Sequence, residues 1–459
     1  MSSPTTQSSP RPPFSISAAV RNLLILGVLF FLARQFYLIY TTSATGNHHT
    51  KHKSDEYLVN YYFNIFQDLI FDGYLTTDSK TLTIGTQFHE YRAALKELGV
   101  WNKKSTKNNV YLPFKDDSFD IQFSSHTGLD SSVDPGRFAS ELSRTLKKEG
   151  YLVIHTESED SYSLNSLLDL FDSFKLIQSK EITSYHWSVP DLREILLQKK
   201  NRVLRRKNLA GSCSVPAYKK ELIRKLEPLI VDEPLKPWID FKKNIKKMKY
   251  LSKMADISFK TRYVYIDVGA RNYESSIGSW FKKLYPKQNK SFEIFAIEAD
   301  KRFHQEYESK KKITLLPYAA WVRNESLFFE INRDPNNTYN EKIQGMGRIQ
   351  SAQTSTNFIR DPNMIRGFDF ANWVRSIFVE KDFVVMKMDV EGTEFDLIKR
   401  MVETGSICLI DEMFLECHYN RFQRCCNGER TTKFQKVYSE CTELFTFLRE
   451  KGVFVHQWW

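Results

Sequence analysis

The sequence contains few cysteines, and none of them forms a Cys-x-x-Cys pair. Only 6 of the 459 residues are cysteine, and five of these lie at or after Cys408. This spacing fits no usual zinc pattern, although a zinc site built from Cys417, His418, Cys425 and Cys426 stays an alternative. We expect one or two disulfide bonds formed in an oxidising compartment, and buried free thiols are the other interpretation.

Acidic residues are absent from the first 54 positions. Residues 1–17 are rich in Ser, Thr and Pro, which predicts a disordered cytosolic tail. Residues 18–40 are apolar and, as a 23-residue segment, long enough to cross a bilayer as a transmembrane signal anchor. Arg11 and Arg21 precede this segment without an opposing acid, so we expect the N-terminus on the cytosolic side. A cleaved signal peptide ending near Ala44 and an organelle transit peptide remain alternatives.

Basic charge is not spread along the chain. Residues 199–260 hold 18 Lys and Arg against 6 Asp and Glu, a balance of +12, so the rest of the +11 chain sums to about −1. A local basic surface without a recognition-helix motif argues against a nucleic-acid partner. We interpret residues 199–257 as a basic linker between two domains, and a patch for anionic lipids or acidic glycans is the alternative.

After a polar stem over residues 41–55, residues 56–198 alternate strand and helix patterns, which is typical of an α/β domain with a parallel sheet. The expected strands and helices are Thr81–Ile84, Glu90–Leu98, Phe119–Phe123, Pro135–Lys147 and Tyr151–His155. Two stretches, Leu112–Asp120 and Leu142–Ile154, resemble the small-molecule class I methyltransferases. The first turn offers only Gly85, and Trp101–Asn109 contains no acid for a ribose. We therefore predict a degenerate, inactive copy; a small active site of altered type is the alternative.

Residues 258–459 begin with a second crossover pattern. The apolar run Tyr263–Ile266 ends at Asp267 and Gly269, and the run Ile294–Ile297 ends at Glu298. Four apolar residues between them recur at the spacing of one helix face: Ile277, Trp280, Phe281 and Leu284. Strand, glycine turn, helix, strand and acid predict a nucleotide-type pocket at the carboxyl edge of a parallel sheet.

Further along, the buried strand pattern Val384–Met388 runs into an acidic box. Asp389, Glu391 and Glu394 follow it within six positions. The polar stretch 332–366 before this strand predicts a long loop of the kind that serves as a lid. Two more strands are expected at Cys408–Leu415 and Val453–Trp459.

These motifs resemble a known family. Ile266-Asp267-Val268-Gly269-Ala270, Ile297-Glu298 and Lys387-Met388-Asp389-Val390-Glu391-Gly392-Thr393-Glu394 look like the FkbM-type S-adenosylmethionine-dependent methyltransferases over roughly residues 258–459. With the degenerate first half, the arrangement resembles a plant family of membrane-anchored, methyltransferase-like proteins. The resemblance implies S-adenosylmethionine as cofactor, bound by six residues: Asp267, Gly269, Ala270, Glu298, Ala319 and Asp389.

The resemblance also suggests a division of tasks. Asp267 and Gly269 would hold the methionine end, and Glu298 would accept both ribose hydroxyls, because an ionised carboxylate only accepts hydrogen bonds. The small Ala319 lies where the family places the adenine. Asp389 or Glu391 would approach the transferred methyl group and the acceptor. His418 is the candidate general base, since its unperturbed pKa lies near neutrality.

Each of these residues also has a structural interpretation. His418 could be a hydrogen-bonded structural histidine, and Glu391 and Glu394 could stabilise the positive end of the following helix. Asp389 and Glu391 could instead hold a divalent ion. These residues do not establish metal dependence, and we expect no metal.

The sequence therefore predicts two Rossmann-like class I methyltransferase domains, with mostly parallel sheets and flanking helices, behind one transmembrane helix. We expect an O-methyltransferase acting on a glycan or small metabolite in the lumen of the Golgi or another endomembrane compartment. Three sequons support that location mildly: Asn289, Asn324 and Asn336. The alternatives are a catalytically inactive scaffold or binding protein and an enzyme that binds another nucleotide, and the oligomeric state stays open.

Overall fold

The computed structural model describes residues 56–107, 110–183, 191–200, 213–331, 347–351, 364–422, 428–431 and 434–459. The predicted tail, transmembrane anchor and stem lie outside these residues. Within them, no helix has the length and apolar character to cross a membrane. The chain divides into two compact units, residues 1–78 with 87–101 and residues 79–86 with 102–459. The domain boundaries drawn from the sequence stay a prediction.

The smaller unit contains two described helices. One covers residues 56–71, and the other is α2 (Phe88–Glu97), close to the predicted Glu90–Leu98. The rings of Tyr62 and Tyr91 meet edge to face, with their centroids 4.5 Å apart. Both side chains are buried, so this aromatic contact joins the two helices of the unit.

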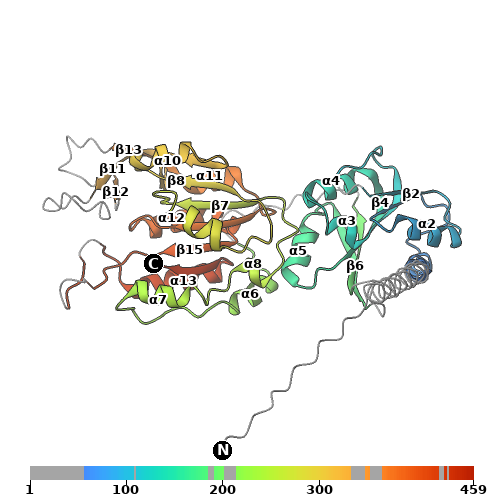
Figure 1. Ribbon diagram of the computed structural model, residues 1–459, viewed down its shortest axis with the longest axis horizontal. Helices are drawn as coiled ribbons and strands as arrows, with labels where there is room; N and C mark the ends of the chain where they lie inside the picture. The colour runs from blue at the N-terminus through green and yellow to red at the C-terminus, as the bar shows by residue number, and fades with distance from the viewer. Residues whose placement is uncertain are drawn as a thin grey trace, which may run out of the picture. The chain divides into compact units, whose positions relative to one another are not determined.

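The larger unit begins with a six-stranded sheet in the order β2-β1-β3-β4-β6-β5 (Figure 1). Its strands are β1 (Thr81–Ile84), β2 (Lys103–Thr106), β3 (Phe119–Ser124), β4 (Leu146–Thr156), β5 (Phe174–Ile182) and β6 (Leu192–Lys199). The first four pair in parallel, and β6 runs antiparallel to both of its neighbours. The α/β fold predicted for this half is confirmed, with a sheet that is mostly rather than entirely parallel.

The helix before β4 shows how local chemistry sets an element. The side chain of Asp134 accepts a hydrogen bond from the backbone N–H of Arg137 at 2.9 Å, and Pro135 occupies the first helical position. This helix, α4 (Pro135–Thr145), ends two residues before the predicted Lys147 because β4 already begins at Leu146. The remaining described helices of this half are α3 (His126–Leu129) and α5 (Ser161–Asp169).

A short helical stretch joins this sheet to the next one. It contains α6 (Ala217–Arg224), α7 (Pro237–Asn244) and α8 (Leu251–Met254). Most of the basic cluster that follows Lys199 in the sequence falls outside the described residues.

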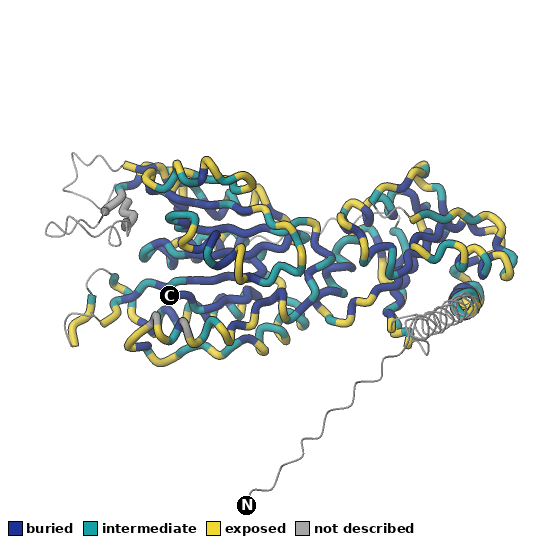
Figure 2. The backbone as a smooth tube through the Cα atoms, in the orientation of Figure 1, coloured by how far each residue is buried: buried dark blue, intermediate teal, exposed yellow. Residues whose placement is uncertain are grey.

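The second six-stranded sheet, the C-terminal sheet, is entirely parallel, in the order β16-β15-β14-β7-β8-β9. Its strands are β7 (Tyr263–Val268), β8 (Glu293–Ile297), β9 (Ile313–Leu316), β14 (Phe383–Met388), β15 (Glu412–Glu416) and β16 (Phe454–Trp458). Every residue of β14 is buried, as expected for a strand covered on both faces. Figure 2 shows the strands of this sheet mostly in the colour of buried residues. The doubly wound α/β fold predicted for this half is confirmed.

The α-helices of this half include α10 (His304–Glu308), α11 (Phe370–Ile377), α12 (Glu394–Thr404) and α13 (Tyr438–Glu450). A separate four-stranded sheet has the order β10-β13-β11-β12. Its strands are β10 (Ala319–Trp321), β11 (Glu325–Ile331), β12 (Gly347–Ser351) and β13 (Met364–Asp369). β12 lies within residues 332–366 and β13 begins there, so the prediction of one continuous loop was wrong.

Two further expectations need correction. The helix expected after β7 begins as a π-helical segment, Ile277–Phe281, and continues as α9 (Lys282–Leu284). Leu284 is 60% exposed, whereas the spacing predicted that it would be buried. A π turn advances more residues per turn than an α-helix, so the spacing no longer brings Leu284 to the core face. In addition, Ser406–Leu409 forms a 3₁₀ turn, and β15 starts only at Glu412. A short apolar run does not by itself distinguish strand from helix.

The cysteines in the described part of the chain form two disulfide bonds. Cys213 pairs with Cys408, and Cys417 pairs with Cys441. The expectation of one or two disulfides is confirmed. The alternative prediction of a zinc site that uses Cys417 is wrong, because the sulfur of Cys417 is bonded to Cys441. The alternative ligands Cys425 and Cys426 lie outside the described residues.

Candidate active site at the carboxyl edge of the C-terminal sheet

The order of the C-terminal sheet defines where a ligand can approach. From β7 the chain proceeds outward to β8 and β9, then returns to β14 on the other side of β7 (Figure 1). The crevice at such a reversal, outside the carboxyl ends of the strands, is where open α/β sheets bind ligands. The ends of β7, β14 and β15 supply most of the predicted site residues there.

Gly269 sits where the turns after β7 and β14 touch. Its φ is +79°, and a Cβ built on it would lie 1.9 Å from the carbonyl oxygen of Asp389. The backbone N–H of Asp389 donates to the carbonyl of Val268 at 2.9 Å, which fixes the two turns against each other. Only glycine fits this position, because both the backbone angle and the space exclude a side chain.

Glu298 follows β8 and is buried, with an exposed fraction of 8%. Its Oε2 accepts a hydrogen bond from the backbone N–H of Arg271 at 2.6 Å, and its Oε1 accepts one from Asp300 at 2.7 Å. Burial raises the pKa of Glu298 to about 7, although both N–H donors favour the ionised form. Each oxygen retains a second lone pair, so the carboxylate could accept ribose hydroxyls as predicted. In this respect the site fits a nucleoside cofactor.

Asp267 at the end of β7 is completely covered. Its Oδ2 accepts a hydrogen bond from the hydroxyl of Ser276, and its Oδ1 lies 3.7 Å from the ammonium of Lys387. Burial raises the pKa of Asp267, while the charge of Lys387 opposes that rise. The predicted contact between Asp267 and the methionine end of the cofactor stays a prediction. In this structure the Asp267 carboxylate contacts Ser276 and Lys387.

The two alanines of the predicted site lie in different places. Ala270 is buried in the core of the C-terminal sheet, and its carbonyl accepts the hydroxyl of Ser275 at 2.7 Å. Ala319 belongs to β10 of the four-stranded sheet, where it is paired with Gly367 of β13. Its small core cluster includes Trp321 and Leu327. Ala299, the residue that follows Glu298, packs against this cluster, and the predicted adenine role of Ala319 stays a prediction.

The turn beyond Gly269 carries bulky side chains where a second glycine would favour a cofactor. The ring of Tyr273 lies 5.1 Å from the ammonium of Lys282 and 4.3 Å from that of Lys310. Glu274 is exposed and forms an ion pair of 3.6 Å with Lys283. Lysines of the segments that follow therefore hold both side chains.

The predicted catalytic residues meet around His418, which follows β15. Its Nε2 lies 3.8 Å from Asp389 Oδ1, 3.7 Å from Glu391 Oε2 and 3.9 Å from Glu416 Oε1. Its Nδ1 lies 2.7 Å from Oε1 of the fully buried Glu394. The ring of Phe434 packs beside the imidazole, with centroids 4.9 Å apart. Three predicted residues thus come together with two glutamates, Glu394 and Glu416, for which no catalytic role was predicted.

The electrostatics of this cluster alter the predicted role of His418. Burial disfavours the imidazolium, but the charge and hydrogen bond of Glu394 outweigh it and raise the pKa of His418 to about 10. A histidine that keeps its proton at neutral pH is a poor general base. Burial and the charge of Asp389 raise the pKa of Glu416 to about 8, which makes this carboxylate the better proton acceptor.

Three residues of the site were missed or given another role. Glu394 was interpreted as a helix-capping acid, and its Oε1 does accept the N–H groups of Val390 and Gly392 at 3.2 and 3.1 Å. The same oxygen also faces His418. Lys387 and Glu416 had a sequence signal, since each lies at the end of a buried strand, but that signal did not distinguish a site residue from a structural ion pair.

The sheet of the first half offers a poorer site at its own carboxyl edge. β2 is followed by Lys107, and no acid lies nearby in the sequence to accept ribose hydroxyls. The hydroxyl of Thr127 accepts the backbone N–H of Thr86 at 2.9 Å, so the first turn is closed by a side chain. This is consistent with the predicted loss of activity, which stays a prediction.

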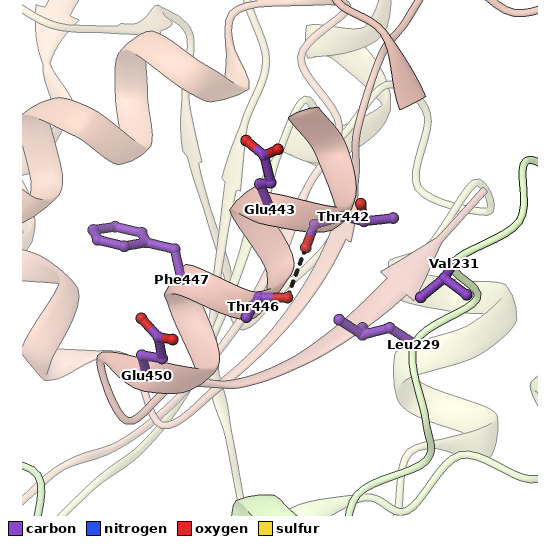
Figure 3. A pocket seen from close by; sticks show the side chains of 7 residues that line it. All are labelled: Leu229, Val231, Thr442, Glu443, Thr446, Phe447 and Glu450. Atoms are coloured by element: carbon purple, nitrogen blue, oxygen red, sulfur yellow. Dashed lines mark hydrogen bonds between the residues drawn. The ribbon is translucent and has the colours of Figure 1, made fainter. Parts of the chain in front are cut away.

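A pocket of about 310 Å³ lies elsewhere, against α13 (Figure 3). Its lining residues are Leu229, Val231, Thr442, Glu443, Thr446, Phe447 and Glu450. It contains none of the predicted site residues, and no group in it suggests chemistry.

Family models match both halves of the chain. Residues 83–154, from β1 to β4, match a methyltransferase domain. Residues 223–327 and 336–459 match a domain of unknown function, DUF7870. No curated protein matches the sequence. The chain thus carries a methyltransferase domain in the half predicted to be degenerate. The half that resembles the FkbM type matches a family without an assigned activity.

Solved structures give weak likenesses. YcgJ from Bacillus subtilis has 14% identity and a TM-score of 0.24, and the match covers 31% of this chain and 100% of that protein. A SAM-dependent methyltransferase from Aquifex aeolicus has 14% identity and a TM-score of 0.24, covering 29% of this chain and 88% of that one. Scores this low carry no inference about function.

Proposed function

We propose that this protein is an S-adenosylmethionine-dependent O-methyltransferase whose active site is the carboxyl edge of the C-terminal sheet. The observation that carries the proposal is Glu298. It is a buried carboxylate at the end of the second strand, next to the Gly269 turn, with a pKa of about 7. A carboxylate held so near its neutral form gains from hydroxyl donors, which is what a ribose offers.

The residues of the site divide the work as follows. When bound, S-adenosylmethionine supplies an electrophilic methyl group. Gly269 leaves room for a ligand beside the backbone, and Glu298 holds the two ribose hydroxyls. The acceptor hydroxyl loses its proton to the carboxylates around His418, with Glu416 the member whose pKa of about 8 best suits that transfer. His418 stays charged and orients these carboxylates.

The methyl acceptor and the cellular location of the protein are proposed from less direct observations. We propose a hydroxyl of a glycan or small metabolite as the acceptor, because the acidic cluster suits proton removal from oxygen. Two disulfide bonds support an oxidising compartment such as the endomembrane lumen. The apolar segment 18–40 would anchor the protein there.

Calorimetry of the full chain with S-adenosylhomocysteine tests the proposal. We expect about one site per chain, and at least roughly tenfold weaker binding in Glu298→Gln, because charge-assisted hydrogen bonds contribute about 1.5–3 kcal/mol. Glu293→Gln is the matched control, since Glu293 begins the same strand and its side chain is 53% exposed. A second control is Thr86→Val, in the turn after β1 of the first sheet, which should bind S-adenosylhomocysteine like wild type.

An inactive scaffold is the second candidate. It is favoured by the covered carboxylate of Asp267 and by the imidazolium of His418, both of which a purely structural ion-pair network would also show. A folded protein without affinity for S-adenosylhomocysteine would support this alternative. Binding that is equal in wild type and Glu298→Gln would remove the ribose role from Glu298.

A further inference from the structure

The cluster around His418 has the composition of a cation site. Nε2 of His418 and one carboxylate oxygen each from Asp389 and Glu416 all lie within 4.8 Å of one another. These side chains come from the ends of the adjacent strands β14 and β15, so the sheet itself holds them at this spacing. One imidazole with carboxylates is a ligand set that divalent first-row metals accept.

We propose that Asp389, Glu416 and His418 bind a divalent first-row cation, with Zn²⁺ or Mn²⁺ as the matching types. Binding displaces the proton that Nε2 of His418 otherwise carries, because a histidine ligand is neutral. Ligand atoms around a tetrahedral Zn²⁺ are roughly 3.4 Å apart, given bonds of about 2.1 Å. Nε2 of His418 lies 3.8 Å from Asp389 Oδ1 and 3.9 Å from Glu416 Oε1. These separations are too long for hydrogen bonds and only a few tenths of an ångström longer than those in a metal-bound set.

The second ring nitrogen of His418 supports the same assignment. Nδ1 of His418 lies 2.7 Å from Oε1 of Glu394, which leaves Nε2 as the atom directed at Asp389 and Glu416. Metal-binding histidines typically donate their second N–H to a carboxylate in this way, which fixes the tautomer and the ring orientation. Glu394 is thus a positioning residue, and its carboxylate is fully buried.

Charge and unsatisfied polar atoms provide a second, independent observation. Five carboxylates gather here against two basic groups, Lys387 and His418: Asp267, Asp389, Glu391, Glu394 and Glu416. Among the described residues, the fully buried Oδ1 of Asp267 and Oε2 of Glu394 have no hydrogen-bond partner. The other oxygen of Glu394, Oε1, faces His418, and Oδ1 of Asp267 lies 3.7 Å from the ammonium of Lys387. A divalent cation would offset the excess negative charge.

The site also has a covered side and an approach for ligands. The ring of Phe434 packs beside the imidazole and over Gly392, where an added Cβ would lie 3.0 Å from the ring. Asp389 keeps 30% of its side chain exposed and Glu416 22%. Cation binding does not depend on S-adenosylmethionine. A link to the acceptor rests on the proposed function: a molecule with two neighbouring oxygen donors would suit the cation's remaining positions.

Metal titration of the full chain, first stripped with a chelator, tests the inference. We expect a site for Zn²⁺ or Mn²⁺ by calorimetry. Asp389→Asn and His418→Gln should each weaken it at least tenfold, and Glu394→Gln by about 10- to 100-fold. Asp396→Asn, an exposed aspartate on α12, is the matched control and should bind like wild type.

Co²⁺ provides a test that needs no variant. Visible absorption of a four-coordinate complex, shifted when Zn²⁺ displaces Co²⁺, would support the site even if the substitutions prevent folding. Absence of Zn²⁺ and Mn²⁺ binding by the folded wild type would overturn the inference, as would equal metal affinity in His418→Gln and Asp396→Asn. S-adenosylhomocysteine binding measured in the presence of chelator shows separately whether the proposed function holds.

Discussion

At the scale of single residues, Gly269 joins the fold to the site. Its backbone angle favours glycine, and its Cβ position overlaps the carbonyl of Asp389 in the neighbouring turn. Any side chain would therefore force apart the two turns that form the floor of the proposed cofactor site. The same residue thus supports both the packing of the sheet edge and the room for a ligand.

We predict that Gly269→Ala lowers the free energy of unfolding by more than about 2 kcal/mol, from backbone strain together with steric overlap. Binding of S-adenosylhomocysteine should fall as well. Gly428→Ala is the control, since Gly428 has a similar φ of +86° but no heavy atom near its Cβ position. Urea denaturation measures both, and equal losses would show that the overlap with Asp389 has no cost.

A second residue of interest is His456 on β16, which is completely buried. Its Nδ1 lies 2.6 Å from Glu227 Oε1, and its Nε2 lies 3.0 Å from Glu412 Oε1. Glu412 also accepts the hydroxyl of Tyr285 at 2.5 Å. Burial alone would lower the pKa of His456, but hydrogen bonds to the two glutamates outweigh it and raise the pKa to about 9.

This raised pKa predicts a pH-dependent stability. The folded pKa of about 9 exceeds the usual 6.5, so the stabilisation by His456 is complete below pH 6.5 and is lost as pH rises through about 9. His456→Gln should cost on the order of 3 kcal/mol at pH 6 and much less at pH 9.5. Unfolding curves across this range measure it, with the exposed His89→Gln as control. A constant difference would contradict the assignment.

At the scale of elements, the end of β15 connects the site to α13. Cys417 immediately precedes His418 and is bonded to Cys441 on α13. The segment that carries His418 is therefore tied covalently to a helix of the core. A disulfide stabilises mainly by limiting the unfolded chain, and more so for longer loops.

We predict that Cys417→Ser with Cys441→Ser lowers the free energy of unfolding by about 3 kcal/mol, because this disulfide closes a loop with a sequence separation of 24. A reducing agent should then destabilise the variant less than wild type, since one of the two disulfide bonds seen among the described residues, Cys213–Cys408, remains to be broken. Denaturation with and without reductant measures this. An unchanged midpoint in the variant would mean that the bond contributes nothing.

At the scale of the whole molecule, the two sheets represent two versions of one architecture. The first contains one reversed strand, β6, and matches a methyltransferase model over residues 83–154. The second is fully parallel and carries the acidic cluster. The match to a methyltransferase model and the acidic cluster therefore lie in different halves of the chain.

Membrane attachment is a prediction for the entire protein. The apolar segment 18–40 should keep the full chain in the membrane pellet after alkaline carbonate extraction, and deletion of these residues should release it. Recovery of the full chain in the soluble fraction would exclude a spanning anchor. Cleavage before Ala44, visible as a shorter mature chain, would favour a signal peptide instead.

The sequence by itself determined the α/β class and most strands, because buried parallel strands are continuous apolar runs bounded by turn residues. β7 and β14 illustrate this, and the strand ends correctly located Asp267, Glu298 and Asp389 at one edge. The wrong predictions were local. They concern the π-helical segment before the exposed Leu284, and the strands β12 and β13, which lie within or begin in residues 332–366.

Only the tertiary structure decided which charges meet. Glu394 and His418 lie 24 residues apart, yet their side chains are 2.7 Å apart and buried together. The pairing of β14 with β15 places Glu416 beside Asp389. Burial disfavours the imidazolium of His418, but the charge and hydrogen bond of Glu394 outweigh burial and keep the predicted base protonated. Protonation depends on distance and desolvation rather than on order along the chain, so no reading of the sequence alone could have assigned it.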